Sequence, residues 1–200
     1  MKLVAFSDPH RRQASAHALV AASDAADVAI GGGDFGDRGQ GALEVLSILA
    51  RVRCPLLIVS GNHDRLDTLE SFADEHDHVQ LLHGTAVTID GLRFVGIGSA
   101  IATAQPSPNS EWLHEDDAAA LLDRHRRCDV LISHTPPWGA ADLHPDGSSG
   151  GSVAVRGFIE RLSPALCVCG HVHRSHGAQA RIGPTLVHNV GPRVAVHEIG

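Results

Sequence analysis

Five short clusters along the chain combine aspartate, asparagine and histidine, and each cluster follows an apolar stretch. They are Asp8-Pro9-His10, Gly33-Asp34-Phe35-Gly36-Asp37-Arg38, Gly61-Asn62-His63-Asp64, Ser133-His134-Thr135 and Gly170-His171-Val172-His173. Carboxylate, amide and imidazole groups without thiolates suit Mn, Fe, Zn, Ni or Co better than a structural zinc held by cysteines. The residue types therefore predict a metal centre with oxygen and nitrogen ligands.

The spacing inside two clusters limits how they could hold ions. In an extended segment, residues i and i+2 face the same way, about 6.6 Å apart. His171 and His173 can therefore each hold one of two ions that lie about 3.5–4 Å apart. Asp8 and His10 have the same spacing and could converge on one ion if the chain bends between them.

Strand and helix patterns alternate through the first part of the chain. The predicted strands cover residues 2–6, 28–30 and 56–59, and the predicted helices cover 14–22, 42–50 and 66–72. Short strands follow at 79–82, 86–89 and 93–97, with Asp90-Gly91 as a hairpin turn between the last two. The clusters come where strands end, which is the edge at which open α/β sheets form sites.

The second part returns to the same alternation. A helix is predicted over 115–127, with early carboxylates and the late Arg124, Arg126 and Arg127 matching the helix dipole. Then follow a strand at 130–133, a helix at 152–161, a strand at 165–169, and strands near 178–182, 185–188 and 194–198. This order predicts an α/β protein with mixed sheets, folded as a single domain over residues 1–200.

Composition excludes several classes of protein. The chain has 200 residues, of which 43% are hydrophobic, so it can bury a sizeable core and is not disordered. A net charge of −7 and few aromatic residues argue against general nucleic-acid binding. The apolar runs are too short for a membrane span, and the start lacks the pattern of a signal peptide. Four cysteines without framework spacing favour a cytoplasmic location.

In their order, the five clusters resemble the motifs of the calcineurin-like metallophosphoesterases: D-x-H, G-D-x-x-D, G-N-H-D, a histidine after a strand, and G-H-x-H. The resemblance spans residues 8–173. It implies a four-layer αββα sandwich of two mixed β-sheets flanked by helices. It also implies two divalent or trivalent metal ions, whose identity among Mn, Fe, Zn, Ni and Co the residues leave open.

The resemblance also implies roles for single residues. The ligands of the first ion would be Asp8, His10 and His173, with Asp34 bridging both ions and Asn62, His134 and His171 completing the second. His63 would lie over the metals near the leaving group, and Asp64 would orient it. The supporting residues would be Asp37 and Arg38, paired with one another, and Asn189 in a late turn near the site.

The implied activity is hydrolysis of small phosphate esters through in-line attack by a metal-bridging hydroxide. A diester is favoured over a monoester, because a chain this short has no room for a cap domain over the site. Residues 133–139, Ser-His-Thr-Pro-Pro-Trp-Gly, with Asp142 soon after, resemble a smaller branch of the family with a His-Thr-Pro-Pro-x-Gly signature. No membrane partner is expected, and the residues indicate no particular oligomeric state.

Three other interpretations were weighed against this one. A non-catalytic scaffold of the same fold is disfavoured because His63 and all seven ligand positions are present. A nuclease is disfavoured because such enzymes need a basic groove for the polynucleotide, and this chain is acidic. A dinucleotide site at Gly31-x-Gly33-x-x-Gly36 is disfavoured because Asp34 would repel a pyrophosphate.

Two long loops, residues 102–110 and 135–151, are expected to set specificity. Within the second loop, Trp138 could form a wall of the substrate site or anchor the loop by packing. His176 and His188 lie near the clusters and are weaker candidates for lining the pocket. Cys167 and Cys169 alternate on one face of a strand and are expected to be core thiols.

Overall fold

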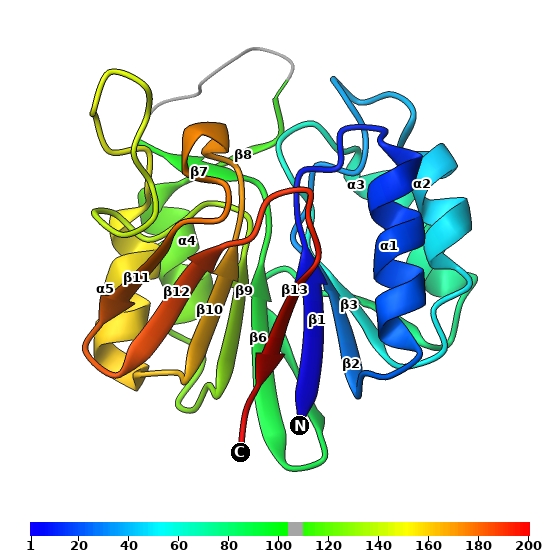
Figure 1. Cartoon of the computed structure of the whole chain (residues 1–200). Helices are drawn as coiled ribbons and strands as arrows, with labels where there is room; N and C mark the ends of the chain where they lie inside the picture. The colour runs from blue at the N-terminus through cyan, green and yellow to red at the C-terminus, as the bar shows by residue number, and fades with distance from the viewer. Residues whose placement is uncertain (104–109) are drawn as a thin grey trace.

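The computed structural model describes residues 1–103 and 110–200, so most of the predicted loop 102–110 lies outside the described residues. Two β-sheets pack face to face, and helices cover the outer surface of each sheet (Figure 1). One apolar core fills the space between the sheets, and a further core lies under the helices on either side. This arrangement confirms the predicted four-layer αββα sandwich.

The first sheet combines the N-terminal strands with the last strand. Its order is β13 (Ala195–Glu198), β1 (Lys2–Phe6), β2 (Val28–Gly31), β3 (Leu56–Ile58) and β4 (Val79–Leu81). Strands β1 to β4 are parallel, and β13 runs antiparallel to β1. Side chains alternate across the sheet, so that Leu3 and Ala5 face the other sheet while Val4 and Phe6 face the helices.

The second sheet has six strands, with antiparallel pairs at both edges. Its order is β11 (Gln179–Ile182), β12 (Thr185–Asn189), β10 (Leu166–Cys169), β9 (Val130–Ser133), β6 (Leu92–Ile97) and β5 (Thr85–Ile89). The four central strands are parallel. Within β10, Leu166 and Val168 face the first sheet, whereas Cys167 and Cys169 are buried free thiols under the helices. Asp90 and Gly91 both have positive φ in the predicted hairpin turn between β5 and β6.

Among the described residues, five helices cover the outer faces of the sheets. α1 (Gln13–Ser23), α2 (Ala42–Leu49) and α3 (Leu66–Asp74) lie on the first sheet, and α4 (Glu115–Leu122) and α5 (Val153–Leu162) lie on the second. A two-stranded parallel pair, β7 (Ala100–Ala102) and β8 (Trp112–His114), was not predicted. Among the helices of the described residues, none has the length and apolar character needed to cross a membrane.

The prediction for α4 was wrong at its C-terminal end. The helix ends at Leu122, so the arginines at 124, 126 and 127 lie beyond it. A cation does meet the end of this helix, but it comes from α5: the guanidinium of Arg161 donates to the carbonyl oxygens of Leu122 and His125 at 3.2 and 2.9 Å. Arg127 pairs instead with Asp129 at 2.9 Å.

The two sheets share one edge for their polar loops. The parallel strands β1, β2 and β3 of one sheet and β9 and β10 of the other all end at the top of the view in Figure 1. Backbone hydrogen bonds tie the loops together there: the Asp8 N–H donates to the Gly33 carbonyl at 2.9 Å, and the Gly170 N–H donates to the His134 carbonyl at 3.0 Å. All five polar clusters therefore meet at this edge.

Candidate active site

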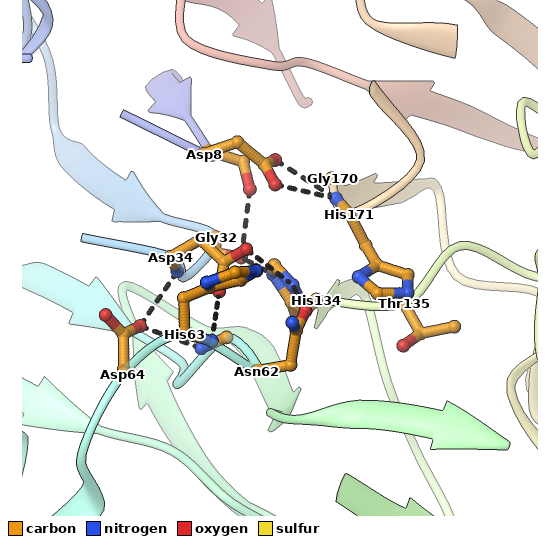
Figure 2. Close-up of polar contacts among 12 residues, drawn as sticks. Asp8, Gly32, Asp34, Asn62, His63, Asp64, His134, Thr135, Gly170 and His171 are labelled. Carbon is orange, nitrogen blue, oxygen red and sulfur yellow. Dashed lines mark hydrogen bonds and ion pairs between the residues drawn. The ribbon is translucent and has the colours of Figure 1, made fainter. Parts of the chain in front are cut away.

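The seven predicted ligand side chains come from both sheets and meet where the strands end. Asp8 follows β1, Asp34 follows β2, and Asn62 follows β3 in the first sheet. His134 follows β9 and His171 follows β10 in the second sheet. Figure 2 shows these groups around a common space, with the backbone N–H of His171 donating to both carboxylate oxygens of Asp8, at 3.1 and 3.0 Å.

Four of these residues offer ligand atoms within 4.8 Å of one another: Asp8, His10, Asp34 and His173. Nε2 of His10 lies 3.0 Å from Nε2 of His173 and 3.5 Å from Oδ2 of Asp34. Nε2 of His173 lies 3.5 Å from Oδ1 of Asp8. The structure therefore brings the predicted ligands of the first ion together, with one ligand atom of each within 4.8 Å of the others.

A second group adjoins the first through Asp34. Nε2 of His134 lies 3.6 Å from Oδ2 of Asp34 and 3.2 Å from Oδ1 of Asn62. The other ring nitrogen of His134 contacts the Gly32 carbonyl at 2.8 Å, which fixes the orientation of the ring. The ring of His171 lies 5.1 Å from that of His134, centroid to centroid. Asp34 is thus the carboxylate that both groups share.

Backbone strain is concentrated at the predicted ligands. The φ angles of Asp8, His10, Asp34 and His171 are 53°, 42°, 57° and 65°, in the left-handed region that non-glycine residues seldom adopt. Backbone strain of this kind persists only where the surroundings hold it in place, and it clusters at functional sites. Here the loops are held by the backbone bonds between residues 8 and 33 and between 10 and 34.

Two glycines allow the loops to approach so closely. A Cβ at Gly61 would overlap the carboxylate and backbone nitrogen of Asp34. A Cβ at Gly170 would overlap Oγ of Ser7 and Oδ2 of Asp8. Any side chain at these positions would push a carboxylate out of the cluster, so the glycines of G-N-H-D and G-H-x-H have a steric role.

The electrostatics of the cluster fit cations. Burial, together with the neighbouring carboxylates Asp8 and Asp64, raises the pKa of Asp34 to about 7. Burial would also raise the pKa of Asp8, but hydrogen bonds from His173 and His176 hold it well below its ordinary value. Within the described residues, neither Asp8 nor Asp34 pairs with a lysine or an arginine. Buried carboxylates that face imidazoles and have no lysine or arginine partner are the situation that metal binding resolves.

The imidazoles are suited to the same purpose. Burial lowers the pKa of His10 to about 4, and burial with the nearby His134 lowers the pKa of His171 to about 3. A neutral imidazole has a free lone pair, which is the form that ligates a metal. The carboxylates act the other way on the remaining two rings: against the effect of burial, Asp34 and Asp8 raise the pKa of His134, and the hydrogen bond with Asp8 raises the pKa of His173. A bound cation would take the place of the proton on these rings, so the donor set of carboxylates, an amide and imidazoles fits a pair of divalent ions.

His63 lies at the rim of the cluster, and its partner differs from the one predicted. Its Nδ1 is 3.1 Å from Oδ1 of Asp37 and accepts a hydrogen bond from the backbone N–H of Arg38 at 3.0 Å. The ring stands edge-on to His10 at 5.1 Å between centroids. The expectation that Asp64 orients His63 was wrong: the carboxylate beside His63 is Asp37.

Asp64 instead supports the backbone of the site. Its buried carboxylate accepts hydrogen bonds from the N–H groups of Asp34, Gly36 and Gly61, at 2.8, 2.9 and 2.8 Å. It thereby joins the G-D-x-x-D loop to the G-N-H-D loop. The expected pairing of Asp37 with Arg38 is not found among the ion pairs of residues 1–103 and 110–200.

Asn189 supports the other sheet's loop. Its buried side-chain amide donates to the carbonyls of Gly170, Val172 and Ala141 at 2.9, 3.2 and 3.1 Å. The late turn therefore lies directly under the G-H-x-H loop, which agrees with the predicted position of Asn189. Through Ala141 it also connects this loop to the segment 135–151.

His176 lies closer to the predicted ligands than its position in the sequence suggested. Its Nε2 lies 3.5 Å from Oδ2 of Asp8, and its ring packs 4.8 Å from that of His173. The signal was its place three residues after His173, at the far end of the 3-10 turn η1 (His173–Ser175). Trp138, by contrast, is half exposed on the segment 135–151.

Comparisons with known proteins agree with this geometry. Residues 1–175 match the family described as calcineurin-like phosphoesterase. The UPF0046 protein K07C11.7 of Caenorhabditis elegans is 30% identical over 210 residues, covering 94% of this chain and 68% of that protein.

Two solved structures share the fold at low sequence identity. TT1561 of Thermus thermophilus has a TM-score of 0.76 at 17% identity, covering 98% of this chain and 97% of that one. A dimetal phosphatase from Danio rerio has a TM-score of 0.61 at 14% identity, covering 95% of this chain and 88% of that one. The family match over most of the chain, together with the worm relative, decides the assignment: this chain belongs to the calcineurin-like phosphoesterases, a family of metal-dependent phosphoester hydrolases.

Proposed function

We propose that this protein is a phosphodiesterase that hydrolyses small phosphate diesters with two metal ions. The observation that carries the proposal is the convergence of carboxylate and imidazole atoms at the joint edge of the two sheets, with Nε2 of His10 only 3.0 Å from Nε2 of His173. Asp8, His10, Asp34 and His173 would hold one ion, and Asn62, His134 and His171 would hold the second together with Asp34. Bound ions would supply Lewis-acid polarisation of the phosphate and a lowered pKa for water at the site.

The chain's own residues then bind and orient the substrate and move protons. The buried carboxylates Asp8 and Asp34 would hold the cations, and the cations would attract the phosphate of the substrate. His63 faces the same space from the rim, where its Nε2 can give a proton to the departing oxygen. The other ring nitrogen, Nδ1, accepts from the Arg38 N–H when unprotonated and donates to Asp37 when protonated, so the ring is kept in one orientation.

The preference for a diester rests on the openness of the site. His173 has a side chain 57% exposed and His10 lies beside it, so both substituents of a diester have room at this rim. Within the described residues, the rim is formed by loops that connect the strands of the two sheets, and no separate cap domain covers it. A monoesterase with the same mechanism is the alternative that the assay below separates.

The finer assignments belong to the same proposal. The buried carboxylate of Asp142 accepts from the N–H groups of Gly139 and Gly151, a structural reason for the His-Thr-Pro-Pro-x-Gly signature and its following aspartate. This supports membership of the smaller branch. We infer a single domain because the core between the sheets takes residues from both halves of the chain, and a cytoplasmic location because the four cysteines are free thiols.

The test is hydrolysis of bis(p-nitrophenyl) phosphate and p-nitrophenyl phosphate in parallel. Protein stripped of metal is reloaded with Mn, Zn, Fe, Ni or Co, and metal content is measured alongside turnover. Metal-dependent cleavage of the diester above the monoester supports the proposal. The reverse preference makes the protein a phosphatase, and two bound metals with no turnover of either ester favours a non-catalytic scaffold.

A further inference from the structure

A hollow of about 660 Å³ adjoins the predicted metal cluster at His176, which lines the hollow and contacts Asp8. It is bounded by the start of α1, by η1, and by the connection that crosses from β12 in one sheet to β13 in the other, which Figure 1 shows at the front of the molecule. Its lining includes Arg12, His176, His188 and Arg193. The hollow is therefore placed where a substituent of a bound phosphate ester could extend.

His176 is the wall shared by the hollow and the metal cluster. One side of its ring packs 4.8 Å from the ring of His173, and Nε2 lies 3.5 Å from Oδ2 of Asp8. Its ring also packs so closely on Gly191 that a Cβ there would overlap it. Only the ring of His176 therefore separates the metal cluster from the hollow. A substrate bound at the cluster could extend past the exposed His173 into the hollow.

The charge of the hollow is opposite to that of the chain. No aspartate or glutamate is among the described residues that line it, although the chain carries a net charge of −7. A second hollow, of about 790 Å³ between α3 and β4, contains Glu70 and Asp74. Arginine recognises phosphate and carboxylate groups through paired N–H donors, so two arginines in an acid-free hollow favour an anion.

The rest of the lining is apolar or aromatic in character. Val190, Pro192 and Val194 from the β12–β13 connection face the hollow together with the ring of His188. A flat organic group could pack on these side chains while a charged group reached the arginines. The hollow thus suits a substituent with an apolar body and a charged end.

We propose that this hollow binds the non-reacting substituent of the substrate, and that Arg12 and Arg193 there select a substituent carrying a second anionic group. This inference rests on the proposed function and narrows the substrate class. The substrate would be a phosphate diester in which one ester arm bears a further phosphate or carboxylate.

The test compares two esters that differ by one phosphate: the p-nitrophenyl ester of thymidine 5′-phosphate, with and without a 3′-phosphate. Both release p-nitrophenol, so the leaving group is constant. The metal-loaded wild type should show a KM at least about tenfold lower for the ester with the 3′-phosphate. That ratio should fall toward one in Arg12→Ala and Arg193→Ala, and it should persist in Arg126→Ala, an exposed arginine outside the hollow.

A binding measurement separates this proposal from the proposed function. Calorimetric titration of the metal-loaded protein with thymidine 3′,5′-bisphosphate and with thymidine 5′-phosphate needs no turnover. Tighter binding of the bisphosphate that depends on both arginines would support the anion site in the hollow. If neither ester were hydrolysed in that case, only the proposed phosphodiesterase activity would be overturned. Hydrolysis of both esters with equal KM, or a preference kept by both arginine variants, would overturn the anion site and leave the phosphodiesterase intact.

Discussion

Nδ1 of His63 lies 3.1 Å from Oδ1 of Asp37, and the backbone N–H of Arg38 donates to the same nitrogen at 3.0 Å. Nδ1 makes one of these hydrogen bonds at a time: unprotonated it accepts from the Arg38 N–H, and protonated it donates to Asp37. Two consecutive residues of the G-D-x-x-D-R segment thus offer Nδ1 a partner in either protonation state. With Nδ1 occupied, Nε2 is the atom left to act on a substrate. Mutations at His63, Asp37 and Asp64 should therefore have different effects on turnover and on stability.

His63→Ala should keep both metals and slow turnover, because His63 is outside the predicted ligand set and near the leaving group. For a diester with a poor leaving group, the loss should be roughly 10²–10⁴-fold, the usual size of general-acid catalysis. For a nitrophenyl ester, which leaves without a proton, the loss should be smaller. Turnover of a nitrophenyl diester and an alkyl diester is measured with metal content, and an equal loss on both would argue against proton donation.

Asp37→Asn should reproduce that leaving-group dependence in weaker form. Losing the carboxylate frees the ring of His63 to turn, with a loss of about 10-fold or more on the poor leaving group. Thermal stability should change little, since the Asp37 side chain is 51% exposed. Asp146→Asn, a fully exposed carboxylate on the segment 135–151, is the matched control. Unchanged alkyl diester turnover in Asp37→Asn would show that the 3.1 Å contact does not position the ring.

Asp64→Asn should mainly lower the free energy of unfolding, because Asp64 supports the backbone of the site and does not face the substrate. The carboxylate accepts three backbone hydrogen bonds in a buried position, and an amide in its place would present N–H to at least one of those donors. Leaving a buried donor without an acceptor costs about 1–3 kcal/mol. Urea unfolding should show this loss, whereas Asp67→Asn, on the exposed surface of α3, should show little. Equal stability of the two variants would contradict the supporting role.

Asp34→Ala should remove at least one metal ion and nearly all turnover. Asp34 is the carboxylate within 3.5 Å of His10 and 3.6 Å of His134, so both ligand groups lose their shared member. Metal content by plasma mass spectrometry and diester turnover check this, with Asp67→Asn again as an exposed comparison. Full activity in Asp34→Ala would contradict the proposal that Asp34 is shared by two metal ions.

The pair His188 and His197 should make folding stability depend on pH. Nδ1 of His188 lies 3.2 Å from Nε2 of His197 at the open end of the core between the sheets. Burial, and then the neighbouring His197, lowers the pKa of His188 to about 4, and burial lowers the pKa of His197. The folded state therefore binds fewer protons than the unfolded chain between an unfolded pKa of about 6.5 and the folded value.

Stability from this pair should accordingly be complete above about pH 6.5 and decline as pH falls toward about 4. His188→Leu should flatten that part of the curve of unfolding free energy against pH, measured by urea denaturation at a series of pH values. His17→Leu, an exposed histidine on α1, should leave the slope as it is. If His188→Leu left the pH dependence of the unfolding free energy unchanged, the loss of stability in acid would come from other histidines.

The buried strands, and the polar clusters that follow them, could be predicted from the sequence. Alternation of apolar side chains is local, so Lys2–Phe6 could be predicted as a strand, and the turn at Asp90-Gly91 could be predicted from residues that tolerate positive φ. Clusters that follow parallel strands must meet at one edge, which is why the set around Asp8, Asp34 and His134 could be anticipated.

The contacts between side chains that are distant in sequence could not be predicted in the same way. The cation at the end of α4 is Arg161, 39 residues from Leu122, although arginines closer in sequence matched the dipole equally well. Asp37 rather than Asp64 faces His63, because Asp64 is drawn inward by three backbone N–H groups. The hollow beside His176 exists because the chain crosses between sheets after β12. Periodicity reports which face of an element is buried, whereas partners across the fold depend on how the sheets and loops pack, and that information is not local.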